Sequence, residues 1–151
     1  MNAVEEYFRG KGCAVTGAAS GIGFAVSEAL LQVGAVVFMA DRDTDTLAAA
    51  VAQLGAHAGR VYSSSVDVTS QEQVRKWIED AASRHGRLDV LFNNAGIGGT
   101  MPFKDVTLDH WRRIIDLNLW GVIYGIDAAL PIMLRQGGGH IVTTSSLAGL
   151  I

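Results

Sequence analysis

The chain has 151 residues, which is enough for one domain with a sizeable core. Hydrophobic residues make up 49% and charged residues 18%, the formal net charge is -3, and no basic cluster is present, so nucleic-acid binding is not expected. The apolar runs are too short to span a bilayer and the acidic N-terminus has no secretory signal, so no membrane association is expected either.

The first strand is expected over residues 11–16, after a polar lead-in over 1–10. A glycine turn follows, and then a helix over 21–33 that Gly34 caps. The apolar face predicted for this helix consists of Ile22, Ala25, Val26, Ala29, Leu30 and Val33.

A continuous apolar run over 35–40 predicts a second strand that is buried on both faces, as in a parallel sheet between helices. The run ends at Asp41, and Asp43 is placed to cap a second helix that Gly55 closes. The inner face predicted for this helix consists of Leu47, Ala50, Val51 and Leu54.

A third strand over 61–66 precedes a helix in which Ser70 and Gln73 have capping-box spacing, with Gly86 at its end. The apolar residues predicted for its inner face are Val74, Trp77, Ile78, Ala81 and Ala82.

A fourth strand is expected over 88–92 and a fifth over 140–144. Between them a long helical segment begins near Leu108, and Pro131 is expected to kink it or end part of it. The apolar face predicted for this segment consists of Trp111, Ile114, Ile115, Leu119, Val122 and Ile126.

Strands and helices therefore alternate, which predicts one α/β domain over 1–151, a Rossmann-like, doubly wound parallel sheet with about five strands. Ligands of such sheets bind outside the carboxyl ends of the strands. Glycine and small polar residues fall at all five of those ends: Thr16–Gly23, Asp41, Asp67, Asn93–Gly96 and Ser145–Ser146. The pattern predicts a nucleotide site.

The glycine turn Thr16–Gly23 lies between the first strand and its helix. Glycine permits positive φ and close approach, and a helix N-terminus offers free N–H groups to a pyrophosphate. An ordinary glycine-rich β–α turn is the alternative.

Asp41 follows Gly23 by 18 residues, close to the spacing at which an acid reaches an adenosine ribose. A 2′-phosphate there meets like charge, so Asp41 favours NAD over NADP. Ser20 supports NAD because it puts no cation in the turn, whereas Arg42 tempers the preference. Asp41 could instead serve as a helix-start aspartate, a role for which Asp43 competes.

These motifs together resemble the N-terminal part of a short-chain dehydrogenase/reductase. Residues 16–23 resemble that family's TGxxxGxG turn, residues 67–68 its adenine-side contact, and residues 93–96 its NNAG segment. Residues 116–118 resemble its helix asparagine and residues 141–146 its catalytic-serine strand. The resemblance covers nearly the whole chain in the family's order.

The resemblance assigns phosphate binding to Gly17, Ser20, Ile22 and Gly23, and the adenosine ribose to Asp41. It places Asp67 and Val68 along the adenine, and Asn94, Ala95 and Gly96 along the nicotinamide-side ribose. Asn93 could equally tie neighbouring strands and is left outside the site.

The catalytic residues implied are Ser146, which would hydrogen-bond the substrate oxygen, and Asn118, which would help hold a water in a proton relay. Ser145 is the alternative serine. The apolar pattern also places Asn118 on the helix stripe, where a buried amide needs partners or costs about 1–3 kcal/mol. A purely structural asparagine is the alternative.

The family's acid–base pair, a Tyr-x-x-x-Lys sequence beyond the serine, does not occur before Ile151. Tyr7 and Lys11 match its spacing by chance, since they precede the carboxyl end of the first strand. The chain is therefore expected to be a fragment or truncated product, incomplete at its C-terminus.

The function implied is NAD(P)-dependent hydride transfer with a small alcohol or ketone substrate, in a parent enzyme that is a homo-oligomer. A dinucleotide-binding module without catalysis is the alternative, and a fragment without function is a third. No metal is expected, because the four histidines are scattered. Cys13 is the only cysteine, so a buried structural thiol and a reducing, cytoplasmic compartment are expected.

Overall fold

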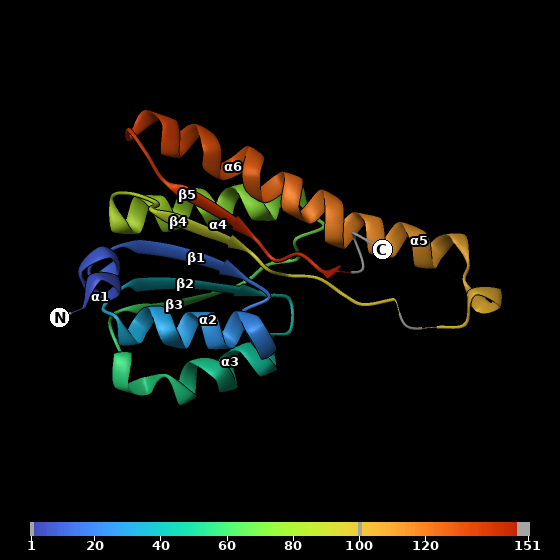
Figure 1. Ribbon diagram of the computed structural model, residues 1–151, viewed down its shortest axis with the longest axis horizontal. Helices are drawn as coiled ribbons and strands as arrows, with labels where there is room; N and C mark the ends of the chain where they lie inside the picture. Colours follow the sequence, from blue (N-terminus) through green and yellow to red (C-terminus); the bar gives the residue numbers. More distant parts are fainter. Residues whose placement is uncertain (1, 100, 148–151) are drawn as a thin grey trace.

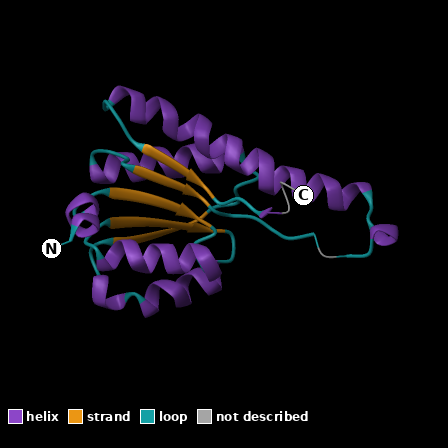
Figure 2. Cartoon of the chain, viewed as in Figure 1, coloured by secondary structure: helices purple, strands orange, loops and turns teal. Residues whose placement is uncertain are grey.

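The computed structural model describes residues 2–99 and 101–147. Their strands form one parallel sheet in the order β3-β2-β1-β4-β5, and all five run in the same direction (Figure 2). The strands are β1 (Gly12–Thr16), β2 (Val36–Asp41), β3 (Val61–Ser65), β4 (Val90–Asn93) and β5 (His140–Thr143). The order changes direction between β1 and β4, as a doubly wound sheet requires, so the predicted fold class is confirmed.

Helices cover both faces of the sheet (Figure 1). Helices α2 (Gly21–Gln32) and α3 (Thr44–Gln53) lie on one face, and α4 (Gln71–His85) and α6 (Gly121–Arg135) on the other. The central strands β1, β2 and β4 contribute side chains to both layers, because successive side chains point to opposite faces. In β1, Val15 packs in the core under α2 and α3, whereas Ala14 packs in the core under α4 and α6. The continuous apolar strands follow from this double burial.

The buried face of α2 differs from the predicted one. Ile22, Ala25 and Ala29 are exposed, and the buried positions are Gly23, Ser27, Leu30 and Leu31. The apolar pattern missed this face because two of its four members are not apolar. Ser27 is buried at no cost in hydrogen bonding, since its hydroxyl donates to the Gly23 carbonyl oxygen over 2.8 Å.

Helix caps follow the sequence in part. Gly34 (φ +90°) and Gly86 (φ +84°) lie in the left-handed region after α2 and α4, as predicted. Gly55, expected to close α3, instead begins a 3₁₀ turn, η1 (Gly55–His57). The capping box at α4 is only half formed, because the Gln73 side chain accepts from the Asp67 N–H rather than from Ser70. The predicted apolar face of α4 is confirmed.

One long helical stretch consists of α5 (Leu108–Ile115), a π-helical turn η3 (Asp116–Trp120) and α6. The apolar face predicted for it is wrong: Trp111 is 49% and Leu119 is 53% exposed. The residues that are buried recur every fourth position: Leu117, Gly121, Gly125, Ala129 and Met133. Glycines have no apolar side chain, so a search for regularly spaced apolar residues does not detect them. The wider π turn also rotates the buried face of the residues that follow relative to that of α5. The helix continues through Pro131 to Arg135.

The stretch Leu108–Arg135 is the one described segment that is long and apolar enough to cross a membrane. Counting uninterrupted apolar runs in the sequence did not reveal it. Helices in the core of a globular domain can have the same length and composition. In this protein α6 packs against α4 and β4, and its residues Ala129 and Met133 belong to the core.

A short helix, α1 (Ala3–Phe8), occupies the segment expected to be a polar lead-in. The Asn2 side chain accepts from the N–H groups of Val4 and Glu5, and the Glu5 carboxylate accepts from the Asn2 N–H. This capping box is the signal that the sequence analysis missed. The helix lies at the amino-end edge of the sheet (Figure 1).

Candidate functional site

A cavity of about 940 Å³ lies at the carboxyl ends of the strands. Its volume is at the upper end of the range for small-molecule and cofactor sites. Each strand contributes through its last residue or through the segment that follows it. All but one of the predicted site residues line it: Gly17, Ser20, Ile22, Asp41, Asp67, Val68, Asn94, Ala95, Gly96, Asn118 and Ser146. The sheet therefore brings together residues that lie up to 129 positions apart, from Gly17 to Ser146.

The exception is Gly23, which is buried behind the cavity wall. A Cβ on Gly23 would collide with the Gly17 carbonyl oxygen and would lie 2.7 Å from the Asn94 side-chain nitrogen. Gly17 adopts φ +63°, and a Cβ there would lie 2.9 Å from the Ala95 Cα. Both glycines are thus required by close backbone approach, Gly17 at the cavity surface and Gly23 beneath it.

The N-terminus of α2 opens into the cavity. Ser20 is the N-cap residue, and its side chain makes no capping hydrogen bond. The first-turn N–H groups of the helix carry the positive end of its dipole and have no partners within the helix. Ile22 was predicted both to bind the cofactor and to face the core. It is 64% exposed where α2 meets the cavity, so it does not face the core. The geometry suits a phosphate group.

Asp41 ends β2 at the cavity, and both of its carboxylate oxygens accept hydrogen bonds. Oδ2 accepts from the Ala19 N–H and Oδ1 from the Asp43 N–H, each over 3.1 Å. The carboxylate thus links β2 to the glycine turn, a contact the sequence did not indicate. Asp43 caps α3, as predicted, and hydrogen bonds from the Thr46 N–H and hydroxyl lower the pKa of its carboxyl. Arg42 and Thr46 also line this end.

Asp67 and Val68 form the wall beyond β3. The Asp67 Oδ1 accepts from the N–H and the hydroxyl of Thr69, at 3.0 and 2.8 Å. These bonds fold the segment into a tight Asx turn and present Val68 to the cavity. Val68 is buried, and its side chain fills the space left by Gly121 at the start of α6.

The two asparagines at the end of β4, Asn93 within the strand and Asn94 directly after it, have different partners. The Asn93 side chain donates to the Val122 carbonyl of α6 over 3.3 Å, so it ties the sheet to a helix. The Asn94 Nδ2 donates to the carbonyl oxygens of Thr16 and Gly17, and its Oδ1 accepts from the Thr144 hydroxyl. The strand-tying role considered for Asn93 therefore falls to Asn94.

Asn118 lies in the π-helical turn. Its side chain accepts from the Ile97 N–H and donates to the Ile97 carbonyl, each over 2.9 Å. The expectation that this amide is buried is wrong, because Asn118 is exposed at the cavity rim. Both polar atoms of the amide are nevertheless hydrogen-bonded to the Ile97 backbone, so Asn118 fixes the loop that follows Gly96.

Ser145 and Ser146 follow β5 and both line the cavity. The assignment of Ser146 as the catalytic serine stays a prediction. Thr144, immediately before them, also lines the cavity and was not singled out in the sequence. The only signal that could have found it is its place at the end of a strand of a parallel sheet.

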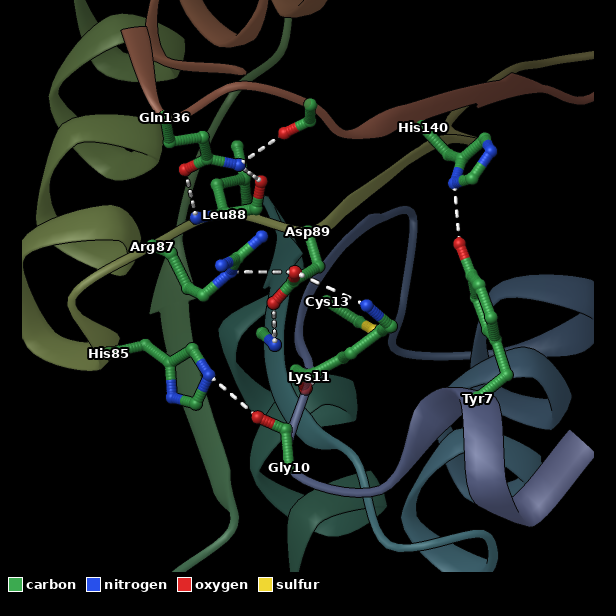
Figure 3. A network of polar contacts seen from close by, with 12 residues as sticks. Tyr7, Gly10, Lys11, Cys13, His85, Arg87, Leu88, Asp89, Gln136 and His140 are labelled. Carbon is green, nitrogen blue, oxygen red and sulfur yellow. Dashed lines mark hydrogen bonds and ion pairs between the residues drawn. The ribbon is translucent and has the colours of Figure 1, made fainter.

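The opposite edge of the sheet holds Tyr7 and Lys11 (Figure 3). The Tyr7 hydroxyl lies 2.6 Å from the His140 Nδ1 at the first residue of β5, and the Lys11 ammonium lies 4.7 Å from the Tyr7 ring centre. Lys11 also pairs with the buried Asp89 at 3.6 Å. These contacts fix α1 to the amino ends of the strands, so the Tyr-x-x-x-Lys spacing there lies away from the cavity.

Cys13 is fully buried in β1. Burial, with a smaller contribution from the Asp89 carboxylate, raises the pKa of its thiol to about 12. Cys13 is therefore a structural thiol, as expected. Among the described residues, no three His, Cys, Asp or Glu side chains converge in a way that could hold a metal ion.

The cavity fits a dinucleotide at three points. Gly17 and the N-terminus of α2 leave room and N–H groups for a pyrophosphate. Asp41 puts an acceptor where a ribose would follow, and Ser145 and Ser146 put hydroxyls at the far end. The cavity also lies at the point where the strand order changes direction.

Comparison with known proteins agrees with this geometry. A family model described as short chain dehydrogenase matches residues 11–151. The chain is 40% identical to an uncharacterized oxidoreductase of Listeria monocytogenes, over 90% of this chain and 55% of that protein. It is 41% identical to 1-deoxy-11-beta-hydroxypentalenate dehydrogenase of Streptomyces avermitilis, over 91% and 52%. The chain thus spans about half the length of these relatives.

Among solved structures, a short chain dehydrogenase/reductase from Burkholderia phymatum in complex with NAD superposes with a TM-score of 0.90. It is 36% identical in sequence, and the match covers 95% of this chain and 52% of that one. The likeness thus extends from the motifs to the whole described fold.

Proposed function

The chain belongs to the short-chain dehydrogenase family, and on that premise we propose that residues 1–151 are the NAD(P)-binding domain of an oxidoreductase. The parent enzyme would transfer hydride between a nicotinamide and a small alcohol or ketone. One observation carries the proposal: a single cavity is lined by Gly17 and Ser20 at the N-terminus of α2, by Asp41 at the end of β2, and by Ser145 and Ser146 after β5.

Each group of residues along the cavity would bind a different part of the dinucleotide. Gly17, Ser20, Ile22 and the amides behind them would seat the pyrophosphate, with Gly23 allowing the close approach. Asp67 and Val68 would line the adenine, and the backbone of Asn94, Ala95 and Gly96 would pass along the nicotinamide-side ribose. The nicotinamide would supply the site that accepts or gives hydride. Ser146 would hold the substrate oxygen, and Asn118 would hold a water near Ile97.

We propose NAD as the preferred nucleotide. The Asp41 carboxylate would accept hydrogen bonds from the 2′- and 3′-hydroxyls and would repel a 2′-phosphate. Arg42 also lines this end of the cavity and moderates the preference.

A second candidate is a dinucleotide-binding module without catalysis. None of the described residues that line the cavity is a tyrosine, lysine or histidine. Its carboxylates, Asp41, Asp43 and Asp67, already accept hydrogen bonds that shape the turns after β2 and β3. This observation favours binding without turnover by the 151-residue chain itself.

Calorimetric titration with NAD and NADP, followed by an assay of NADH formation with a panel of secondary alcohols, tests both candidates. We expect NAD to bind. Turnover would support the enzyme, and binding without turnover would support the module. The matched variant is Ser20→Asp, which keeps a good N-cap for α2 but puts a negative charge at the phosphate seat. It should fold and lose nucleotide binding, and absence of binding by the unaltered chain overturns both candidates.

We further propose a cytoplasmic protein that has no nucleic-acid or membrane partner and whose parent enzyme is a homo-oligomer. The exposed apolar side chains of α5, η3 and α6, such as Trp111, Leu119 and Leu134, support self-association. Sedimentation velocity at increasing concentration tests it. Leu119→Lys should shift the protein toward monomer, and a monomer at every concentration would exclude association.

A further inference from the structure

Asn94 occupies a point where three strand ends meet. Its Nδ2 donates to the Thr16 carbonyl over 3.1 Å and to the Gly17 carbonyl over 3.4 Å. Its Oδ1 accepts from the Thr144 hydroxyl over 2.9 Å. One amide therefore joins the end of β1, the end of β4 and the residue that follows β5.

The backbone of the same residues is fixed by Thr16. The Thr16 hydroxyl oxygen accepts from the N–H groups of Asn94 and Ala95, each over 3.0 Å. The Asn94 side chain also lies close to Gly23, where an added Cβ would come within 2.7 Å of it. The amide is thus enclosed between the glycine turn, the start of α2 and Thr144, and every polar atom of its side chain is in use.

Thr144 is held on both sides. Its N–H donates to the Asn93 carbonyl over 3.0 Å, which continues the pairing of β5 with β4. Its hydroxyl donates to Asn94, so the chain that leads directly into Ser145 is coupled to the turn at Gly17. Without this hydroxyl the Asn94 Oδ1 loses its acceptor bond, and the amide is free to rotate away from the Thr16 and Gly17 carbonyls.

We propose that Thr144 is a positioning residue whose hydroxyl, acting through the Asn94 amide, holds the Gly17 turn in the shape that receives the nucleotide phosphates. The inference rests on the proposed nucleotide-binding function. It adds a direct side-chain link between the phosphate end and the serine end of the cavity.

The test compares Thr144→Val, which removes the hydroxyl at nearly constant volume, with Thr144→Ser, which keeps it. Calorimetry should show NAD binding weakened about three- to tenfold by the valine and near the unaltered value for the serine. In an Asn94→Ala background the valine should have no further effect, because the link is already broken. If the hydroxyl were only structural, Thr144→Val would lower the melting temperature and leave the dissociation constant for NAD unchanged. That result would overturn the inference.

Hydrogen exchange of the ligand-free protein tests the same link, from Thr144 through Asn94 to the Gly17 turn, without a nucleotide. The Ala18 N–H donates to the Ala40 carbonyl and the Ala19 N–H to Asp41, so both amides report on the turn. They should exchange faster in Thr144→Val than in Thr144→Ser. Equal rates in the two variants overturn the inference even where NAD does not bind, whereas failure of NAD to bind the unaltered chain overturns only the proposed function.

Discussion

At the scale of the residue, Asp41 shows how one side chain can serve a binding site in two ways. Its carboxylate accepts from the Ala19 and Asp43 N–H groups and so shapes the glycine turn before any ligand arrives. Asp41 also lines the cavity, where a ribose would add further hydrogen bonds. Truncation to alanine therefore removes both functions, and an isosteric change is the sharper probe.

We predict that Asp41→Asn weakens NAD about 10- to 100-fold, because hydrogen bonds to a charged acceptor are stronger than neutral ones. NADP should be weakened less or should gain, since the charge that repels its 2′-phosphate is gone. Calorimetric dissociation constants for both nucleotides check this. Asp45→Asn is the control, because it removes the same charge from the first turn of α3 at a residue that does not line the cavity. Equal losses for both nucleotides would refute the ribose assignment.

A second residue-scale prediction concerns Cys13. Because burial raises the pKa of its thiol to about 12, the thiol is neutral at all pH values well below 12. At pH 8 roughly one thiol in ten thousand is ionised, so iodoacetamide should not label the folded protein. Mass spectrometry should show labelling only after unfolding in urea. Equal labelling rates for the folded and unfolded chain would contradict a buried thiol.

At the scale of the element, α6 approaches the sheet through its small residues. A Cβ on Gly125 would collide with the Asn93 carboxamide oxygen, and one on Gly121 would lie 3.0 Å from the Val68 side chain. Asn93 and Val68 both line the cavity, so the close approach of this helix also sets the shape of the site. Other apolar residues of the helix, Ile123, Leu130 and Leu134, are exposed on its outer face.

We predict that Gly125→Ala lowers the free energy of unfolding by about 1–3 kcal/mol, because the added methyl group must displace Asn93 or the helix. Urea denaturation monitored by circular dichroism measures the change. Gly55→Ala is the control, because a Cβ there meets no atom within 4 Å and its φ is ordinary. That variant should be neutral or slightly stabilised. An unchanged free energy of unfolding in Gly125→Ala would show that α6 does not approach Asn93 this closely.

At the scale of the whole molecule, the strand order brings the ends of β1 and β4 together as neighbours. Their connections leave toward opposite faces of the sheet (Figure 1), and this divergence opens the cavity between them. A ligand seated there touches segments from β1 to β5 and so binds the folded chain but not the unfolded one. Stability and binding are therefore linked.

We predict that NAD at 100 times its dissociation constant adds about 2.7 kcal/mol to the free energy of unfolding and raises the melting temperature by about 5–10 °C. NADP at the same concentration should raise it less. Differential scanning calorimetry measures both shifts, and Ser20→Asp should show neither. A rise of the same size in Ser20→Asp would place the nucleotide elsewhere on the protein.

The sequence by itself determined the alternation of strands and helices, the parallel sheet and the strand ends at which the site lies. It could do so because buried parallel strands are continuously apolar, and because glycine turns and N-caps are local chemistry. Its motifs also named most of the cavity lining, from Gly17 to Ser146. The short helix α1 was accessible to the same local rules through its Asn2–Glu5 capping box.

Only the tertiary structure decided which helix faces are buried, that Gly23 lies behind the cavity, and that Asn94 rather than Asn93 ties the strand ends. Helix faces that pack largely through glycine, alanine and serine leave little apolar periodicity. The sequence pattern therefore selected exposed positions such as Ile22 and Trp111, and on α2 it found Leu30 but not Gly23 or Ser27. The bonds from Asp41 to Ala19 and from Thr144 to Asn94 join residues 22 and 50 positions apart. Such pairs are set by the register of neighbouring strands, which no local pattern specifies.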